Sequence, residues 1–319
     1  MATFLITGGA GFIGTNYCQY VVEKYPNDFF ICYDALTYAG SLEGLEKIKG
    51  NKNFKFYHGN ICDKKKLIKI FTKYKIDVII NFAAETHVDR SIEASEVFVE
   101  TNIKGTHTLL ELAKAYNISR FHQVSTDEVY GDLDNKASLF TEESALHPSN
   151  PYSASKAAAD MLVMSYMRTY NLSCSISRCS NNYGPYQNSE KFIPMIIQKS
   201  IDDKSIPIYG DGLNRRNWIY VLDHCIAVDL IVRNAPSGKI YNIASEHEVE
   251  NIELAKMILK YLEKEDVLLT FVKDRKGHDF RYSMDISKIK NDLNWKPHHS
   301  IDVGLQKTIE WYKEKYKKA

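Results

Sequence analysis

Short apolar runs alternate with longer amphipathic stretches through the first half of the chain. The short runs predict buried strands, and the stretches between them place apolar residues at helical spacing. The predicted strands cover residues 3–7, 29–33, 54–57, 78–82, 120–124 and 174–178, and the predicted helices cover about residues 11–24, 64–74, 97–116 and 152–170. Strands joined by helical crossovers of roughly 10–20 residues form βαβ units. The pattern therefore predicts an α/β fold with a parallel, doubly wound sheet.

The alternation breaks down after about residue 178, where turn-rich segments replace it. Residues 181–185 and 209–212 are such segments, and an isolated strand is predicted near residues 241–243. Two late helices are predicted near residues 252–262 and 303–315. We therefore expect residues 1–178 to form the doubly wound domain and residues 179–319 a smaller α+β lobe. The two are expected to exchange some elements and to pack with a cleft between them.

Composition and charge are those of an ordinary soluble enzyme. The 319 residues carry 41 Lys and Arg against 40 Asp and Glu, so no overall field attracts nucleic acid or an anionic membrane. No apolar run approaches the roughly 18 residues of a membrane span, and the first strand begins too early for a secretory signal. Several of the six cysteines lie in apolar runs, as buried reduced thiols do. We expect a cytoplasmic protein without nucleic-acid or membrane partners.

A glycine-rich turn follows the first predicted strand and opens the first predicted helix. Gly8, Gly11 and Gly14 allow a tight turn, close approach of a pyrophosphate, and contact between helix and strand. The N-terminus of that helix offers free N–H groups and positive potential to phosphates. Asp34 ends the second predicted strand, where its carboxylate accepts hydrogen bonds from a ribose 2′-hydroxyl and repels a 2′-phosphate. The pattern predicts a Rossmann-type site for NAD rather than NADP.

Two polar motifs indicate chemistry beside that cofactor. Thr126, Asp127 and Glu128 place a hydroxyl, an acid and a base at the end of a predicted strand. Tyr152 and Lys156 follow at i and i+4, on one face of a predicted helix. For a tyrosine to act as a base near pH 7, its pKa must fall from about 10, which requires about 4 kcal/mol. Lys156 and the positive nicotinamide are the expected source of that stabilisation.

The two adjacent carboxyl groups suit opposite roles in the reaction. Close carboxylates cannot easily both ionise, so Asp127 is expected to stay protonated as an acid while Glu128 acts as a base. A protein needs this pair together with Tyr152 and Lys156 if it moves a hydride and also eliminates water.

Several segments resemble the extended short-chain dehydrogenase/reductase superfamily, and within it the nucleotide-sugar 4,6-dehydratases. These segments are residues 34–40, 83–91, 125–131, 178–186, 218–221 and 274–279, in the same order along essentially the whole chain. The resemblance implies an NAD-dependent lyase that dehydrates an NDP-glucose to NDP-4-keto-6-deoxyglucose for deoxysugar biosynthesis, such as that of rhamnose. It also implies a homodimer, in which the helices near residues 97–116 and 152–170 pair into a four-helix bundle.

The resemblance also implies a role for each site residue. Tyr152, as phenolate, would take the proton of the sugar C4 hydroxyl, with Thr126 bound to the same oxygen. Glu128 would remove the C5 proton, and Asp127 would protonate the departing C6 hydroxyl. The implied NAD contacts are Gly8, Gly11, Phe12, Ile13, Gly14, Asp34, Leu36, Thr37, Asn60, Ile61, Ala83, Ala84, Thr101, Tyr152, Lys156 and Asn182. The implied substrate contacts are Thr86, Asn181, Lys191, Phe192, Pro207, Tyr209, Arg216, Asn251, Arg275 and His278.

The nucleotide part of the substrate is less sharply defined by the sequence. Arg216 and Arg275 are the expected phosphate ligands, because a guanidinium binds phosphate oxygens in pairs. Thymine and uracil differ by one methyl group, worth about 1–3 kcal/mol, so dTDP-glucose is favoured only slightly over UDP-glucose. The positions that depart from the family pattern are Asn60 and Thr86 near the cofactor, and Asn217, Leu222 and Lys276 near the substrate.

Two other functions remain open from the sequence. A nucleotide-sugar 4-epimerase or decarboxylase shares most of these motifs but typically lacks the adjacent Asp127 and Glu128. A dinucleotide-sensing scaffold has no chemical need for the five polar residues of the two motifs. No cluster of His and Cys has ligand spacing, so no metal is expected.

Overall fold

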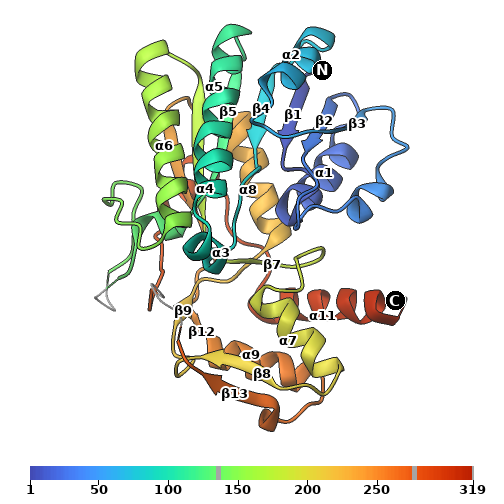
Figure 1. Cartoon of the computed structure of the whole chain (residues 1–319), viewed down its shortest axis with the longest axis vertical. Coiled ribbons are helices and arrows are strands. Elements are labelled where there is room, and N and C mark those ends of the chain that lie inside the picture. The colour runs from blue at the N-terminus through green and yellow to red at the C-terminus, as the bar shows by residue number, and fades with distance from the viewer. Residues whose placement is uncertain (134–137, 275–278, 318–319) are drawn as a thin grey trace.

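A computed structural model describes residues 1–133, 138–274 and 279–317, and its largest feature is a seven-stranded parallel sheet (Figure 1). The strand order is β11-β6-β5-β4-β1-β2-β3, so the order reverses at β1, which lies between β2 and β4. The predicted doubly wound sheet is therefore confirmed. The strands are β1 (Thr3–Thr7), β2 (Phe29–Asp34), β3 (Phe54–His58), β4 (Val78–Asn81), β5 (Arg120–Thr126), β6 (Cys174–Cys179) and β11 (Lys239–Ile243).

Helices cover both faces of this sheet, because alternate residues of a strand point to opposite faces. In β1, Phe4 and Ile6 pack into one apolar core, whereas Leu5 packs into another on the opposite face. The first core is covered by α1 (Phe12–Lys24) and α8 (Val221–Asn234), and the second by α2 (Lys64–Lys73), α5 (Thr106–Ala115) and α6 (Pro151–Tyr170).

The start of α6 is fixed by its own sequence. The side chain of Asn150 accepts a hydrogen bond from the backbone of Ser153, and the Ser153 hydroxyl bonds the backbone of Asn150 in return. Pro151 occupies the first turn, where its missing N–H costs nothing. The helix ends at Asn171, which takes the left-handed conformation that terminates helices. These local signals determine where Tyr152 enters the helix.

A smaller lobe lies below the sheet in Figure 1 and is built from residues after 178. Its apolar core joins α7, α9, α11 and the two-stranded sheet of β8 and β13. Its main elements are α7 (Phe192–Ile201), β8 (Ile206–Tyr209), α9 (Asn251–Tyr261), β13 (Leu269–Val272) and α11 (Ile301–Lys317). The short elements of the chain are η1 (Glu43–Lys47), α3 (Val88–Glu93), α4 (Glu96–Phe98), η3 (Asp127–Tyr130), β7 (Asn182–Tyr183), β9 (Arg215–Arg216), β10 (Ile219–Tyr220), β12 (Val249–Glu250), η4 (Asp266–Leu268) and α10 (Ser287–Leu293).

The strand expected near residues 241–243 is not isolated, which corrects the prediction. It is β11, and it pairs in parallel with β6 as the seventh strand of the main sheet. The helix before it, α8, was not predicted, and it packs on α1 against one sheet face. Elements after residue 178 thus complete the sheet, while the exact division of the chain into two domains stays a prediction.

The helix expected over residues 97–116 is not a single α-helix. It consists of α4, a π-helical segment over Val99–Gly105, and α5. Wider π-helical turns re-aim side chains and are frequent at functional sites. In this segment Thr101 faces the cleft described below, and Asn102 is buried against the neighbouring loop.

All six cysteines are free thiols, and five of them are buried. Among the described residues, none of the helices has the length and apolar character needed to cross a membrane.

Candidate active site

A deep cleft opens at the carboxyl ends of the central strands, between the sheet and the smaller lobe. Its walls come from the glycine turn, the ends of β2, β4 and β5, the start of α6, and the segment that follows β6. The space between its walls, including the open mouth, is about 1540 Å³. Its position matches the rule that doubly wound sheets bind ligands where the strand order reverses.

The glycine turn lies at the floor of the cleft and tolerates no side chain. Gly8 has a φ of +71°, and a Cβ atom on it would lie 2.4 Å from the backbone nitrogen of Ala83. A Cβ on Gly14 would lie 2.2 Å from the carbonyl oxygen of Gly8. Gly11 is the N-cap of α1 and leaves the first amides of the helix without a side-chain partner. The turn therefore offers a bare backbone and a helix N-terminus to a pyrophosphate.

Asp34 joins the end of β2 to this turn. Its carboxylate accepts hydrogen bonds from the backbone amides of Ala10, at 2.9 Å, and Leu36, at 2.8 Å. Asp34 is 8% exposed and forms part of the cleft wall. A carboxylate fixed in this way is positioned to accept hydrogen bonds from a ribose, as the sequence predicts.

The structure brings together nearly all residues expected to contact NAD. Among them only Leu36 is outside the cleft wall; it has a φ of +50° and donates its amide to Asp34. Those in the wall are Gly8, Gly11, Phe12, Ile13, Gly14, Asp34, Thr37, Asn60, Ile61, Ala83, Ala84, Thr101, Tyr152, Lys156 and Asn182. Together with the side-chain-free cradle at Gly8, they fit a dinucleotide.

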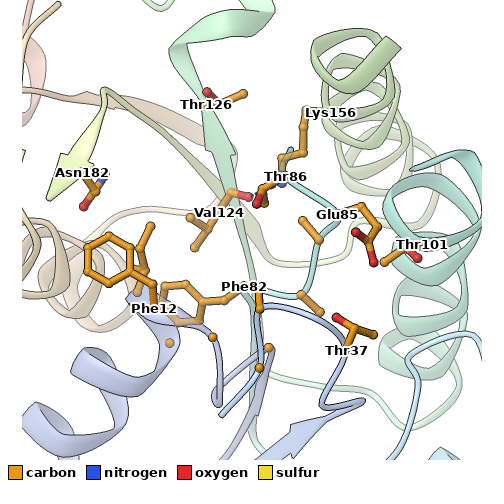
Figure 2. Close-up of a pocket in the computed structure, with 18 of the residues that line it drawn as sticks. Phe12, Thr37, Phe82, Glu85, Thr86, Thr101, Val124, Thr126, Lys156 and Asn182 are labelled. Carbon is orange, nitrogen blue, oxygen red and sulfur yellow. Dashed lines mark hydrogen bonds between the residues drawn. The ribbon is translucent and has the colours of Figure 1, made fainter. Parts of the chain in front are cut away.

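Glu85 and the π-helical segment form one side of the cleft (Figure 2). Asn102 accepts from the backbone amide of Glu85 at 2.8 Å and donates to its carbonyl oxygen at 3.0 Å, which fixes this loop. Burial raises the pKa of the Glu85 carboxyl. Asn102 also donates to Ser155 of α6 at 2.8 Å, so the π-helical turn ties three segments of the wall together.

The carboxyl pair lies at the end of β5, where η3 begins. Thr126 caps η3: its hydroxyl accepts from the amide of Glu128 at 3.3 Å and donates to the Asp127 carboxyl at 3.2 Å. Burial, and then the nearby charge of Glu128, raise the pKa of Asp127 to about 8. A buried acid beside a carboxylate is the arrangement that the sequence predicts for a proton donor and a base.

Tyr152 and Lys156 face the same region from the first turns of α6. The ammonium of Lys156 donates to the carbonyl oxygen of Val124 at 2.7 Å, and Figure 2 shows it reaching toward the end of β5. Burial and the charge of Glu128 raise the pKa of Tyr152 well above 10, while Thr126 opposes this shift. The sequence predicts a lowered pKa for Tyr152, whereas the protein groups around its phenol raise that pKa. Lys156 does not offset the burial of the phenol in this structure.

Three residues expected to contact the substrate also form part of the cleft wall: Thr86, Asn181 and Lys191. The ammonium of Lys191 donates to the carbonyl oxygen of Thr86 at 3.2 Å, which links the loop before α7 to the loop after β4. The amide oxygen of Asn181 is buried without a hydrogen-bond partner in the described chain. It is therefore placed to accept from a bound ligand.

The other expected substrate contacts that the structure describes lie in the smaller lobe, outside this wall. Phe192 begins α7 and stacks on Trp218, with ring centroids 6.1 Å apart. Asn251 begins α9, and its side-chain oxygen is buried without a partner in the described residues. Pro207 and Tyr209 belong to β8. Arg275 and His278, and the departure at Lys276, lie outside the described residues.

Arg216 is more enclosed than a phosphate ligand is expected to be. It is 4% exposed, and its guanidinium donates to the carbonyl oxygens of Arg215, Asp279 and Phe280. It also lies over the ring of Tyr282, 4.3 Å from its centroid. Its charge nevertheless lowers the pKa of Asp127, so it acts electrostatically on the carboxyl pair. Phosphate binding by Arg216 stays a prediction.

The cleft contains residues to which the sequence analysis gave no role. Glu85, Ser125 and Ser180 fall inside the motifs used for the family resemblance, so their positions were available from the sequence. Gln187 and Asn188 directly follow the segment 178–186, and no sequence signal marked them. Within the described part of the chain, no group of three or more His, Cys, Asp or Glu residues could hold a metal ion.

Comparison with known proteins agrees with this geometry. The sequence profile of the family described as GDP-mannose 4,6 dehydratase matches residues 5–308. The chain is 44% identical to a dTDP-glucose 4,6-dehydratase of Neisseria meningitidis serogroup B, over 98% of this chain and 93% of that protein.

Solved structures of similar proteins have the same fold. The dTDP-glucose 4,6-dehydratase of Bacillus anthracis in complex with NAD has a TM-score of 0.93 at 42% identity, covering 99% of this chain and 98% of its own. A Streptomyces venezuelae dTDP-glucose 4,6-dehydratase with NAD bound has a TM-score of 0.94 at 42% identity, covering 98% of this chain and 97% of its own. A UDP-glucose 4-epimerase of Thermotoga maritima is also similar, with a TM-score of 0.91 at 28% identity, covering 98% and 99%.

Proposed function

This chain belongs to the GDP-mannose 4,6-dehydratase family, and we propose that within it the protein dehydrates dTDP-glucose to dTDP-4-keto-6-deoxyglucose. It is a hydro-lyase of deoxysugar biosynthesis with NAD as its cofactor. The glycine turn and Asp34 would hold the dinucleotide, and Thr86, Asn181 and Lys191 would contact the sugar nucleotide. When bound, NAD accepts a hydride from C4 of the sugar and returns it to C6.

The chain's own groups carry the first proton transfer. Tyr152 accepts the proton of the C4 hydroxyl as that carbon is oxidised to a ketone. Thr126, which already contacts the phenol, donates a hydrogen bond to the same sugar oxygen and aligns it. Lys156 lies one helical turn further along α6 and supplies positive charge to the phenolate.

The carboxyl pair then eliminates water across C5 and C6. The 4-ketone acidifies the hydrogen at C5, and Glu128 removes it as general base. Asp127 gives its proton to the C6 oxygen, which leaves as water, and a C5–C6 double bond forms. After the hydride reaches C6, the protonated Glu128 returns a proton to C5 and gives the 4-keto-6-deoxy product.

The buried Asp127 beside Glu128 at the end of β5 is the observation that carries this proposal. The fold alone does not distinguish a dehydratase from an epimerase, because the Thermotoga maritima epimerase shares it. An epimerase returns the hydride to C4 and has no water to expel, so it needs no acid at C6. The raised pKa of Asp127, caused by burial and by Glu128, supplies that acid near neutral pH.

Incubation with dTDP-, UDP- and GDP-glucose in parallel tests the proposal. We expect the base-induced chromophore of a 4-keto sugar with dTDP-glucose first, and more slowly with UDP-glucose. If dTDP-glucose yields only its C4 epimer, or no product, the dehydratase proposal is wrong. If UDP-glucose turns over faster, the activity stands but the assigned nucleobase does not.

The pH dependence of kcat should reveal the acid. Asp127 donates a proton only while protonated, and its pKa is raised to about 8. We therefore expect kcat to fall as pH rises through about 8, because the proton donor is lost above its pKa. Asp127→Asn should lack this limb and turn over about 10²-fold or more slowly. A wild-type kcat that stays constant through this pH range would contradict the assignment.

We further propose that the protein is a homodimer joined through the outer faces of α5 and α6, which lie together on one side of the sheet in Figure 1. Val97 of α4 and Val99 of the π-helical segment precede α5, and Met161 belongs to α6; they are exposed by 44%, 52% and 51%. A cluster of exposed apolar side chains marks an interface more often than a free surface.

Met161→Glu should weaken this dimer, because it places a charge in an apolar contact. We expect the dissociation constant to rise at least about tenfold, measured by light scattering during size-exclusion chromatography. The control is Val267→Glu, since Val267 is 80% exposed in η4 on the smaller lobe. A wild-type protein that is monomeric, or a Met161→Glu dimer as stable as wild type, would contradict this interface.

The cytoplasm stays the predicted compartment.

A further inference from the structure

A buried ion pair lies directly behind Lys156 and is not used by the mechanism above. Tyr152, Lys156 and Asp160 follow one another at i, i+4 and i+8, on one face of α6. The Asp160 carboxylate accepts a hydrogen bond of 3.0 Å from Nε of Arg178 on β6. The side chains of Arg178 and Asp160 are only 2% and 0% exposed. Burial raises the pKa of the Asp160 carboxyl, and the charge and hydrogen bond of Arg178 oppose that shift. Buried charges are costly, so this pair calls for a reason.

Burial of Lys156 opposes the protonated state that its role requires, and the ion pair can offset this effect. Lys156 must stay protonated to support a phenolate, yet it is enclosed, and burial lowers the pKa of its ammonium. Its hydrogen-bond acceptor, the carbonyl oxygen of Val124, carries no net charge. The nearby charge of Asp160 raises the pKa of Lys156 again.

We propose that Asp160 is a positioning residue for the dehydration: held as a carboxylate by Arg178, it keeps Lys156 protonated and so favours the phenolate of Tyr152. The inference rests on the function proposed above and adds two residues to its machinery.

With Lys156 protonated, the charges of this cluster balance when Tyr152 is ionised. Arg178, Asp160 and Lys156 carry a net charge of about +1 when all are ionised, which is unfavourable in a buried site. Ionisation of Tyr152 brings the sum to zero. Without Asp160, the proton of Lys156 is lost more easily, and the phenol of Tyr152 then loses its neighbouring cation.

Asp160 is closer to Lys156 than to Tyr152 along the helix, so it affects the phenol mainly through Lys156. At a rise of about 1.5 Å per residue, Asp160 is roughly 6 Å along the axis from Lys156 and roughly 12 Å from Tyr152. Its negative charge therefore acts more on Lys156 than on the phenol.

The other groups around this cluster do not replace Asp160. On η3, the charge of Glu128 opposes the phenolate of Tyr152. On β6, burial raises the pKa of the Cys179 thiol to about 12, which keeps the thiol neutral. The α3 and α4 side of Tyr152 presents Val88 and Phe98, which are apolar. Tyr130 of η3 contacts the ion pair itself, where its hydroxyl accepts a hydrogen bond of 3.0 Å from Nη1 of Arg178. Asn102 and Ser125 nearby are neutral, and Glu111 of α5 bonds Tyr166 far along α6.

Ultraviolet titration of the tyrosinate in the NAD-loaded enzyme tests the proposal without turnover. The difference between each enzyme and its Tyr152→Phe counterpart isolates the absorbance of Tyr152. In Asp160→Asn we expect the midpoint of phenolate formation to rise by about one pH unit or more, because the cation beside Tyr152 is lost first. Asp160→Glu should keep a midpoint near that of wild type.

A neutral double variant separates this role from a structural one. Asp160→Asn with Arg178→Gln removes both buried charges, so a merely structural ion pair predicts a return to the wild-type midpoint. The proposal predicts that the midpoint stays raised. Asp229→Asn is the control, because the buried carboxylate of Asp229 pairs with the partly exposed Arg233 on α8, away from the cleft. It should lower stability without moving the Tyr152 midpoint.

The outcomes distinguish this inference from the function on which it rests. A midpoint that is unchanged in both Asp160→Asn and the double variant overturns the role of Asp160, even if the wild type makes the 4-keto product. If the wild type makes no product, the proposed function falls, whatever the titration shows. If Asp160→Asn alone fails to fold, the double variant and Asp160→Glu decide.

Discussion

Replacing Tyr152 with phenylalanine is expected to lower kcat by about 10³-fold or more, within the range for loss of a general base. The ring packs between Val88 and Phe98 and should stay in place, so only the proton acceptor for the C4 hydroxyl is lost. Rapid mixing with dTDP-glucose should give no absorbance from reduced nicotinamide, and the affinity for the sugar nucleotide should change only a few-fold.

The matched control for this experiment is Tyr183→Phe. Tyr183 is also buried, but its hydroxyl donates to the carbonyl oxygen of Ile301 in the smaller lobe, outside the cleft wall. Its loss should cost about 1 kcal/mol of stability and leave the chemistry intact. If Tyr152→Phe still reduced the cofactor at the wild-type rate, its role as the base would be wrong.

Replacing Glu128 with glutamine is expected to stop the reaction one step later. The amide cannot remove the C5 proton, so formation of the 4-keto-6-deoxy product should fall by about 10²–10⁴-fold. Reduced nicotinamide should still form, because Tyr152 and Lys156 are unchanged. In deuterated water, the sugar should gain no deuterium at C5.

A second glutamate provides the comparison for this variant. Glu142 is partly buried, and its carboxylate accepts from the backbone amide of Asn242 at 2.8 Å. Glu142→Gln should keep both hydride transfer and dehydration. Normal product formation by Glu128→Gln would show that another group removes the C5 proton. Glu142→Gln should also leave the absorbance of Tyr152 unchanged, since it does not line the cleft.

The alternation of strands and helices was accessible from the sequence because strands buried on both faces are short and continuously apolar. The six strands predicted before residue 178 all occur in the sheet. The seventh, β11, was not placed there, because strand order depends on contacts between distant segments. The preceding helix, α8, was missed because it mixes buried Asp223, His224 and Asp229 with apolar residues.

The cleft was predictable for a similar reason. Its floor is made by short motifs in which residue type and spacing are set by local geometry, such as the glycine turn from Gly8 to Gly14. The enclosure of Arg216 was not predictable, since its three acceptors come from the local strand and from residues 279–280. Nor was the π-helical segment, whose sequence is compatible with an ordinary helix.

By itself, the amino-acid sequence determined the doubly wound fold, the dinucleotide turn and the five polar side chains proposed for the reaction, because each depends on residues that are neighbours in the chain. Only the tertiary structure decided how the pKa values of Asp127 and Tyr152 shift. Burial and the neighbouring Glu128 raise the pKa of Asp127 to about 8, and burial raises that of Tyr152, against expectation. Desolvation and charge proximity are properties of packed segments. The role inferred for Asp160 likewise emerged only once β6 lay against α6.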